Sequence, residues 1–319
     1  MNSIKTICLL LSGLGLLLFM PTTARGERLP IKTYTTSDGL VSNRISRIVR
    51  DSRGYLWFCT ENGLSRFDGY SFTNYTTHQG LPDNDIDDLL ETRDGTYWVA
   101  TAKGLCRYNP RGLPLSTKQS SLTNEPMFVV YRPDGEPSAS VIKTLFQDRS
   151  GAIWVGTWRG LYRLEQIGAE VRFHFVELGM PPSEPQRHVI RNMLEDHQGA
   201  LWMTTDCGLY RRWPDGRVDR FTANHGLASD NMMGLAEDRH GRIWVGNRSG
   251  GLCLLVSEPV ADRAVVERRY TTKDGLGCVF ITSIYKSSDG RVWAGADCGL
   301  SEMLFDSGRA GQTITVRLS

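Results

Sequence analysis

The chain has 319 residues, enough for one large domain or two ordinary ones. Its hydrophobic fraction of 40% and charged fraction of 23% are typical of a globular protein, and a formal net charge of +2 gives no reason to expect nucleic acid as a partner. The 33 glycines, together with Trp, Tyr and Phe, favour strands and tight turns over helices.

The N-terminus has the features of a targeting segment. Lys5 precedes a mostly apolar stretch over residues 7–20, and small residues at 22–24 offer a cleavage site after Ala24. This stretch is shorter than the roughly 20 residues that a membrane-spanning helix needs. We therefore expect a signal peptide over 1–24 and an exported, periplasmic chain over 25–319. The alternative is an uncleaved anchor at the periplasmic face of the inner membrane.

A repeat follows, seen first in "DSRGYLWFCTENGLSRFDG" at 51–69. Six tryptophans share one register: a glycine lies three residues before each, Asp, Ser or Thr lies six before, and apolar residues lie nine and twelve before. Gly-Leu begins six residues after the tryptophan in units 1 to 4 and 6, and seven residues after it in unit 5. The six tryptophans are Trp57, Trp98, Trp154, Trp202, Trp244 and Trp293.

Each unit is predicted to form four strands. The first carries the apolar pair, the second carries the tryptophan, the third opens at Gly-Leu, and the fourth alternates as in 72–75 and 268–271. Units of this length with four short strands are typical of propeller blades, in which the tryptophan packs between neighbouring blades. We therefore predict an all-β propeller of four-stranded antiparallel blades.

The predicted strands do not divide into whole blades, because one strand is left over. Residues 31–36 match a lone fourth strand, but the sixth unit already has its own fourth strand at 313–318. The sequence thus predicts six blades plus a lone N-terminal strand, as in a truncated seven-bladed ring.

The pattern I-x-x-I-x-x-D-x-x-G-x-x-W-x-x-T-x-x-G-L-x-R resembles the two-component regulator propeller repeat. "DGLVSNRI" at 38–45 and "QGLPDNDI" at 79–86 match the linker typical of that family, and the resemblance covers about 31–305. It implies the periplasmic sensor part of a membrane histidine kinase or hybrid regulator. The kinase or another output module would lie in a longer chain or in a separate protein.

No enzyme motif is present in the sequence, and the acidic run "DNDIDD" at 83–88 lacks the spacing of a calcium loop. We expect no catalysis, no cofactor and no metal. The cysteines after the signal, among them Cys59, Cys106, Cys207, Cys253 and Cys298, fall at repeat-equivalent positions. Equivalent positions in different blades are far apart, so the sequence predicts free or buried thiols.

One face of the propeller is the candidate binding site. The turns between second and third strands share it with the linkers, and their tips differ in charge and shape while the turn scaffold repeats. Trp158 lies outside the core register and could stack on a sugar or, with Arg159, clamp an anion; alternatively, it folds over a neighbouring loop. The candidate residues are Glu61, Asn62, Lys103, Trp158, Arg159, Asp206, Arg248 and Asp297 on the turns, and Asn43, Asn84, Asp230 and Asn231 on the linkers.

The leading hypothesis is a non-catalytic propeller that senses a small molecule, a carbohydrate or a partner for a two-component pathway. One alternative is a stand-alone protein-binding scaffold, with the excursion at 110–126 as its contact surface. A less favoured one is an enzyme of the streptogramin-lyase kind, which needs a general-base histidine near an acid. No such pair is evident in the sequence. A homodimer is left open.

Overall fold

The computed structural model describes residues 32–113, 125–135, 137–168, 170–258, 263–305 and 314–318. The chain divides into an N-terminal unit, Met1–Tyr34, and a main unit, Thr35–Ser319. The predicted signal peptide over 1–24 lies outside the described residues. Within the described ranges, no helix has the length and apolar character to cross a membrane.

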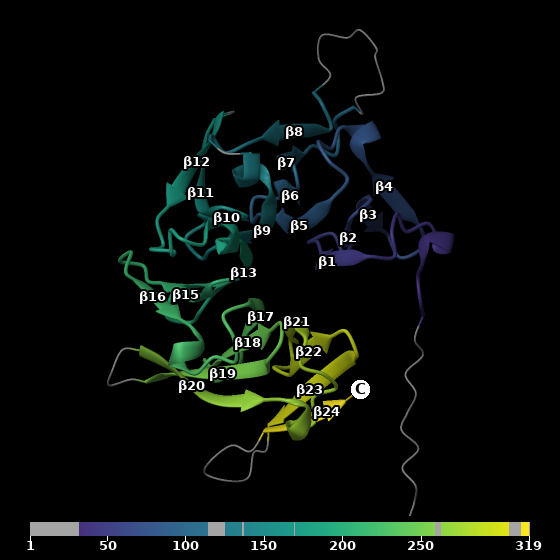
Figure 1. Cartoon of the computed structure of the whole chain (residues 1–319). Coiled ribbons are helices and arrows are strands. Elements are labelled where there is room, and N and C mark those ends of the chain that lie inside the picture. The colour runs from purple at the N-terminus through teal and green to yellow at the C-terminus, as the bar shows by residue number, and fades with distance from the viewer. Residues whose placement is uncertain are drawn as a thin grey trace, which may run out of the picture. The chain divides into compact units, whose positions relative to one another are not determined.

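The main unit is built of six blades, each a four-stranded antiparallel sheet whose strands follow chain order (Figure 1). Blades 1 to 3 consist of β1 (Ile45–Arg50), β2 (Leu56–Thr60), β3 (Gly63–Phe67), β4 (Phe72–Tyr75); β5 (Ile86–Glu91), β6 (Tyr97–Thr101), β7 (Gly104–Tyr108), β8 (Phe128–Tyr131); and β9 (Ile142–Gln147), β10 (Ile153–Thr157), β11 (Gly160–Ile167), β12 (Glu170–Val176). Blades 4 to 6 consist of β13 (Ile190–Glu195), β14 (Leu201–Thr205), β15 (Gly208–Arg212), β16 (Val218–Phe221); β17 (Met232–Glu237), β18 (Ile243–Asn247), β19 (Gly251–Glu258), β20 (Arg263–Tyr270); and β21 (Ile281–Lys286), β22 (Val292–Ala296), β23 (Gly299–Phe305), β24 (Ile314–Leu318). The described residues contain no α-helix; their short 3-10 helices are η1 (Thr36–Asp38), η2 (Thr77–Gln79), η3 (Pro137–Ser140), η4 (Pro185–Arg187), η5 (Ala223–His225) and η6 (Thr272–Asp274).

The strand boundaries confirm the predicted register. Every first strand begins at the apolar residue twelve positions before the tryptophan, and every third strand begins at the glycine of Gly-Leu. The glycine is required by close packing. At Gly63, where φ is +140°, an added Cβ would lie 2.6 Å from the carbonyl oxygen of Tyr75 on the fourth strand.

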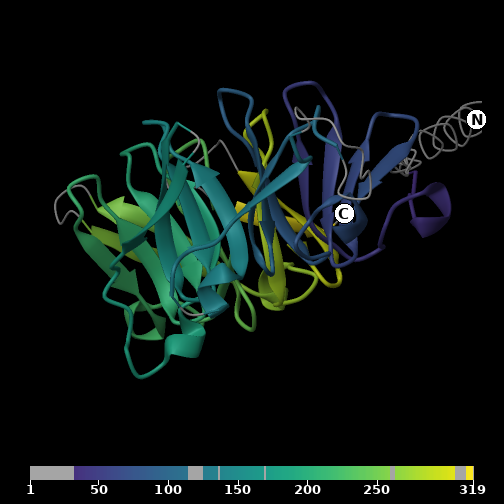
Figure 2. The ribbon, with the colours of Figure 1, turned by 90° about the horizontal axis from the view of Figure 1, so that it is seen from above.

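Consecutive blades pack through their first strands, β1 on β5, β5 on β9, β9 on β13, β13 on β17 and β17 on β21. Figure 2 shows the strands of successive blades standing side by side. A buried hydrophobic cluster fills each of these interfaces. Trp57, for example, packs with Ile86 and Leu89 of blade 2. The predicted role as core between blades is confirmed for Trp57, Trp98, Trp154, Trp202 and Trp244, whereas Trp293 of blade 6 is half-buried and belongs to none of these clusters.

The aspartate six residues before the tryptophan holds the indole ring. Trp57 Nε1 donates to Asp51 Oδ2 over 2.9 Å, and the bond recurs in the pairs Trp154–Asp148, Trp202–Asp196 and Trp244–Asp238 at 2.7–3.0 Å. Blade 2 has Thr92 at this position, and the buried Nε1 of Trp98 has no hydrogen-bond partner. Each aspartate also accepts backbone N–H groups of its turn, so one side chain fixes both the turn and the core.

A second repeated contact, here called the latch, joins neighbouring blades. Ser52 N donates to Glu91 Oε2, at the end of the next first strand, over 2.6 Å. The latch recurs as Arg93 to Gln147, Arg149 to Glu195 and His197 to Glu237, at 2.7–3.0 Å. At the equivalent position blade 6 has Lys286, whose ammonium group cannot accept a hydrogen bond. The latch therefore joins blades 1 to 5 and not blade 6.

Blades 1 and 6 expose the faces that other blades bury. Ile48 of β1 is 56% exposed, whereas its equivalents in β5 and β21, Leu89 and Ile284, are 3% and 9% exposed. Leu300 of β23 is 41% exposed, and the equivalent leucines of the other five blades are fully buried. Among the described residues, no buried cluster joins blade 6 to blade 1. The six-bladed prediction is confirmed, and these two faces lack a neighbouring blade in the described part of the chain.

The predicted lone strand over 31–36 does not form in its described part. Lys32–Thr35 is irregular and Thr36 begins η1. A strand needs a partner for its backbone groups, and none of the described sheets includes these residues. Instead, the side chains of Thr35 and Asp38 form a capping box around η1.

Candidate functional site

The candidate site is the rim, defined here as the six turns between second and third strands together with the linker residues before each first strand. In blades 1 to 4 a threonine closes the turn. Thr60 Oγ1 donates to the carbonyl of Gly63 over 2.7 Å, and Thr101, Thr157 and Thr205 make the same bond at 2.7–3.0 Å. The turn backbone of these four blades is thus built alike, and their tips differ.

Most turn residues of the predicted site are accessible. Glu61, Asn62, Lys103, Trp158, Arg248 and Asp297 are exposed, whereas Arg159 and Asp206 are half-buried. The side chain of Trp158 is 51% exposed, so it lies outside the core as the register predicted. Arg159 lines a cavity of about 180 Å³ together with Phe175, Leu178 and His188.

Several charged rim residues are paired. Lys103 Nζ lies 2.7 Å from Asp83, and Glu61 lies 3.3 Å from Arg44. Burial opposes the ionisation of Asp83, but the hydrogen bonds from Lys103 and from backbone N–H groups, together with the charge of Lys103, outweigh it, so the pKa of Asp83 is lowered. Asp206 accepts two hydrogen bonds from Arg191, at 2.6 and 2.7 Å. The exposed pair of Glu61 and Arg44 contributes little to stability, whereas the pair of Arg191 and Asp206 is largely buried.

Three linker residues have a structural role. The side-chain oxygens of Asn43, Asn84 and Asp230 accept the N–H of the residue that opens the preceding 3-10 helix, at 2.7–2.9 Å. Asn231 differs, because its Oδ1 is buried without a hydrogen-bond partner. The twelve predicted residues are spread over all six blades rather than gathered in one pocket.

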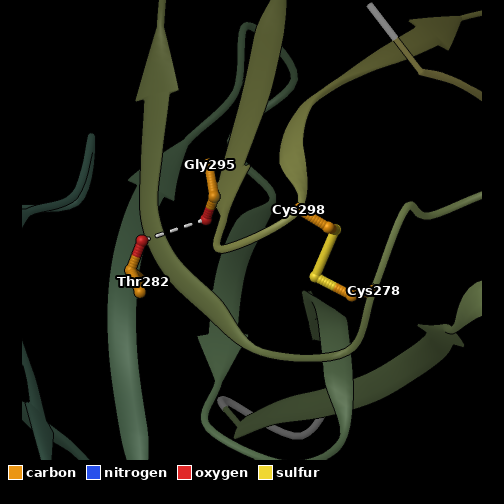
Figure 3. Close-up of a disulfide and its surroundings, with 4 residues drawn as sticks. All are labelled: Cys278, Thr282, Gly295 and Cys298. Carbon is orange, nitrogen blue, oxygen red and sulfur yellow. Dashed lines mark hydrogen bonds between the residues drawn. A yellow bond between two sulfur atoms is a disulfide. The ribbon is translucent and has the colours of Figure 1, made fainter.

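The cysteine prediction is wrong at one place. Cys278 and Cys298 form a disulfide, with Cα atoms 6.1 Å apart (Figure 3). Cys278 lies in the linker before β21 and Cys298 in the turn between β22 and β23, so both belong to the rim of one blade. The prediction compared equivalent positions in different blades and overlooked this contact within a blade.

The other described cysteines behave as predicted. Cys59, Cys106, Cys207 and Cys253 are buried free thiols. Burial raises the pKa of Cys106 to about 12 and that of Cys59 well above its usual value. They are therefore inert core residues.

A second concave feature escaped the sequence analysis. The first strands of all six blades line a central cavity of about 790 Å³. Two carboxylates of the acidic run at 83–88 lie at or beside it, Asp87 against Lys143 and Asp88 against Arg47. Burial raises the pKa of Asp87 to about 6 despite the opposing Lys143. Among the described residues, no three His, Cys, Asp or Glu side chains are arranged to hold a metal ion.

Comparison with known families identifies the repeats. The two component regulator propeller model matches residues 39–62, 80–103, 135–159 and 226–249. The chain carries two-component regulator propeller repeats. The matched segments are the linkers and first two strands of blades 1, 2, 3 and 5.

Solved structures share this architecture. Virginiamycin B lyase from Staphylococcus aureus superposes with a TM-score of 0.60 at 12% identity, over 85% of this chain and 83% of the lyase. PorZ, a surface component of the type-IX secretion system of Porphyromonas gingivalis, has a TM-score of 0.58 at 17% identity, over 80% of this chain and 38% of PorZ.

A third similar structure is the extracellular domain of a protein described as a hybrid two component system from B. thetaiotaomicron. It has a TM-score of 0.48 at 19% identity; the match covers 82% of this chain, which spans 39% of that domain. At these identities the likeness concerns the fold alone. None of the curated proteins matches the sequence.

Proposed function

We propose that this chain is a non-catalytic, exported sensor module of a two-component pathway, which binds a ligand or partner at its rim. The observation that carries the proposal is the match of four blades to the two component regulator propeller model. An output module, a histidine kinase or another signalling domain, would receive the signal in the same chain or in a separate one.

The rim supports a binding role because its chemistry varies on a constant scaffold. The threonine–glycine bond repeats in four blades, while the tips carry a carboxylate and an amide in blade 1, a lysine in blade 2 and Trp158-Arg159 in blade 3. Binding residues are commonly carried by loops on a rigid framework. Trp158 offers an exposed ring, and Arg159 follows it in the chain; these two residue types suit a sugar ring or an anion.

A glycan screen read by tryptophan fluorescence tests the proposal. A ligand that changes the fluorescence of the wild type should give no change with Trp158→Ala and a weaker response with Arg159→Ala. Tyr70→Ala is the matched control, since Tyr70 is an aromatic side chain 96% exposed on the turn between β3 and β4, at the other end of the strands. If both rim variants respond like the wild type, the ligand binds elsewhere. Pull-down from a periplasmic extract distinguishes a protein partner from a glycan.

A lyase is the second candidate, favoured by the fold shared with virginiamycin B lyase. The described histidine–carboxylate pairs argue for structural roles. His197 Nδ1 lies 2.5 Å from Glu237, but its backbone N–H bonds the same carboxylate as part of the latch. His174 pairs with Glu165 across the outer strands β11 and β12 at 2.8 Å. We expect no turnover of a streptogramin-type cyclic depsipeptide; turnover that is lost with His197→Ala or His174→Ala would favour the enzyme.

A further inference from the structure

The central cavity is lined by one equivalent residue from each blade. This residue lies one position after the apolar residue that begins the first strand, and all six copies face the cavity. They are Ser46, Asp87, Lys143, Arg191, Met233 and Thr282. A volume of about 790 Å³ lies within the range of small-molecule sites, about 300–1,000 Å³.

The residue type at this position differs in every blade: two carry a hydroxyl group, two a positive charge, one a carboxylate and one a thioether. The residue just before it, which begins the strand, is always Ile or Met, and this Ile or Met is buried in blades 2 to 6. The fold therefore restrains the neighbour and leaves the cavity position unrestrained. Equivalent residues of a repeat protein can surround one axis and still differ in type. Such a set of residues can recognise an asymmetric ligand.

Three cations reach this cavity from three blades. They are Arg47, Lys143 and Arg191, whose side chains are 39%, 20% and 25% exposed. Each is held by one carboxylate: Arg47 by Asp88 at 2.9 Å, Lys143 by Asp87, and Arg191 by Asp206. These anchors position the cations but do not use all their donors, since a guanidinium group has five N–H and an ammonium group three.

Donors outnumber acceptors on the cavity wall. Arg47 contacts Asp88 through Nε, so both of its terminal nitrogens are without a partner among the described residues. Arg191 contacts Asp206 through Nε and Nη2, which leaves its other terminal nitrogen without a partner among these residues. Asn192 accepts the N–H of Met193 with its Oδ1, so its amide nitrogen also remains a donor. Among the described residues that line the cavity, Asp87 is the only carboxylate, and its Oδ2 is buried.

We propose that the central cavity binds a small molecule bearing an oxyanion, such as a carboxylate or phosphate, through Arg47, Lys143 and Arg191. Planar guanidinium groups match such oxyanions with paired hydrogen bonds, which are stronger than neutral ones. The site goes beyond the rim site proposed above and does not depend on it. Arg191 connects the two, because its carboxylate partner Asp206 is a rim residue.

Calorimetric titration with citrate at pH 8, and separately with inorganic phosphate, tests the proposal. We expect saturable binding of at least one of them, weakened by about tenfold or more in Arg191→Gln. Arg172→Gln is the matched control, because Arg172 makes the same two-bond pair with Glu170, at 3.0 and 3.1 Å, but lies on the outer strand β12. Its affinity should equal that of the wild type.

Asp87→Asn separates binding from folding. It removes the single negative charge on the wall, so it should tighten citrate binding, an effect that a poorly folded variant cannot imitate. The proposal is overturned if neither anion binds the wild type, or if Arg191→Gln and Arg172→Gln bind alike. Weaker binding by Asp87→Asn would also contradict it. Failure here leaves the rim proposal untouched, since the glycan screen reads Trp158.

Discussion

Asp51 and Trp57 are joined by a 2.9 Å hydrogen bond from the indole Nε1 to the carboxylate, and the same carboxylate accepts the hydroxyl of Tyr97 in the next blade at 3.0 Å. One buried side chain therefore ties a turn, its own blade and the neighbouring blade together. This bond explains why Asp and Trp recur six residues apart in four of the six repeats.

Asp51→Ala should be strongly destabilising. It leaves Trp57 Nε1, the Tyr97 hydroxyl and the N–H groups of Arg53 and Tyr55 without their acceptor. We expect a loss of about 3 kcal/mol in the free energy of unfolding, measured by urea denaturation. Asp68→Ala is the control, since Asp68 also accepts backbone N–H groups but in an exposed turn, and it should cost clearly less. Equal costs would contradict the role assigned to the indole bond.

Blade 2 can be improved by copying blade 3. The double change Thr92→Asp with Asp94→Ser reproduces the Asp-Arg-Ser turn of blade 3 without altering the net charge. It supplies an acceptor to the unpartnered Nε1 of Trp98. We expect a gain of about 1 kcal/mol in the free energy of unfolding. A neutral or destabilising result would show that the indole of Trp98 is satisfied in another way.

The exposed face of blade 1 predicts unequal costs at equivalent positions. Leu89→Ala removes a side chain that is 3% exposed and should cost about 2–5 kcal/mol. Ile48→Ala removes one that is 56% exposed and should cost less than about 1 kcal/mol. Denaturant titration of both variants measures the difference. A cost at Ile48 as large as that at Leu89 would mean that another blade covers this face.

The Cys278–Cys298 disulfide should stabilise blade 6. It closes a loop with a sequence separation of 20 residues, for which the loss of chain entropy in the unfolded state corresponds to about 3 kcal/mol. Thermal unfolding of the wild type with and without dithiothreitol measures this. The double variant Cys278→Ser with Cys298→Ser should resemble the reduced wild type and should not respond to dithiothreitol. A response in that variant would assign the effect to another contact.

Oxyanion binding in the central cavity should depend on pH. The pKa of Asp87 is raised to about 6. Burial is the main cause; Lys143 lowers the pKa, and the negative charges of Asp85 and Asp88 raise it further. Below that pH Asp87 takes up a proton, and the cavity gains one unit of positive charge. Sulfate, which does not titrate in this range, should bind more tightly at pH 5 than at pH 8. Asp87→Asn should remove most of this dependence, and an unchanged dependence would assign it to another group.

The repeat made the fold predictable in detail. Offsets from the tryptophans located the start of every first and third strand, because an apolar residue and Gly-Leu occupy the same places in the sheet of each blade. The same regularity hid two features. Cys278 lies outside the repeat register, so its contact with Cys298 within one blade was not considered. The cavity residues share a position, but no residue type recurs there, so a search for common residues passed over Arg191 and Lys143.

The candidate binding site was less predictable for a physical reason. Asn43, Asn84 and Asp230 looked like variable polar tips, but their oxygens hold the 3-10 helices of the linkers. Such local side chain to backbone bonds are not visible in residue type alone. The exposure of Trp158 was predictable, since a tryptophan outside the core register has no blade interface to fill.

The central claim is that positions which differ between blades carry binding while the repeated positions carry the fold. The double variant Lys143→Thr with Arg191→Ser tests it most directly, because it gives blades 3 and 4 the residues that blades 6 and 1 already have at the cavity position, Thr282 and Ser46. Citrate titration combined with thermal unfolding is the measurement. We expect a cooperative unfolding transition like that of the wild type and a loss of citrate affinity of about 100-fold or more. Unchanged citrate affinity in the folded variant would contradict the account.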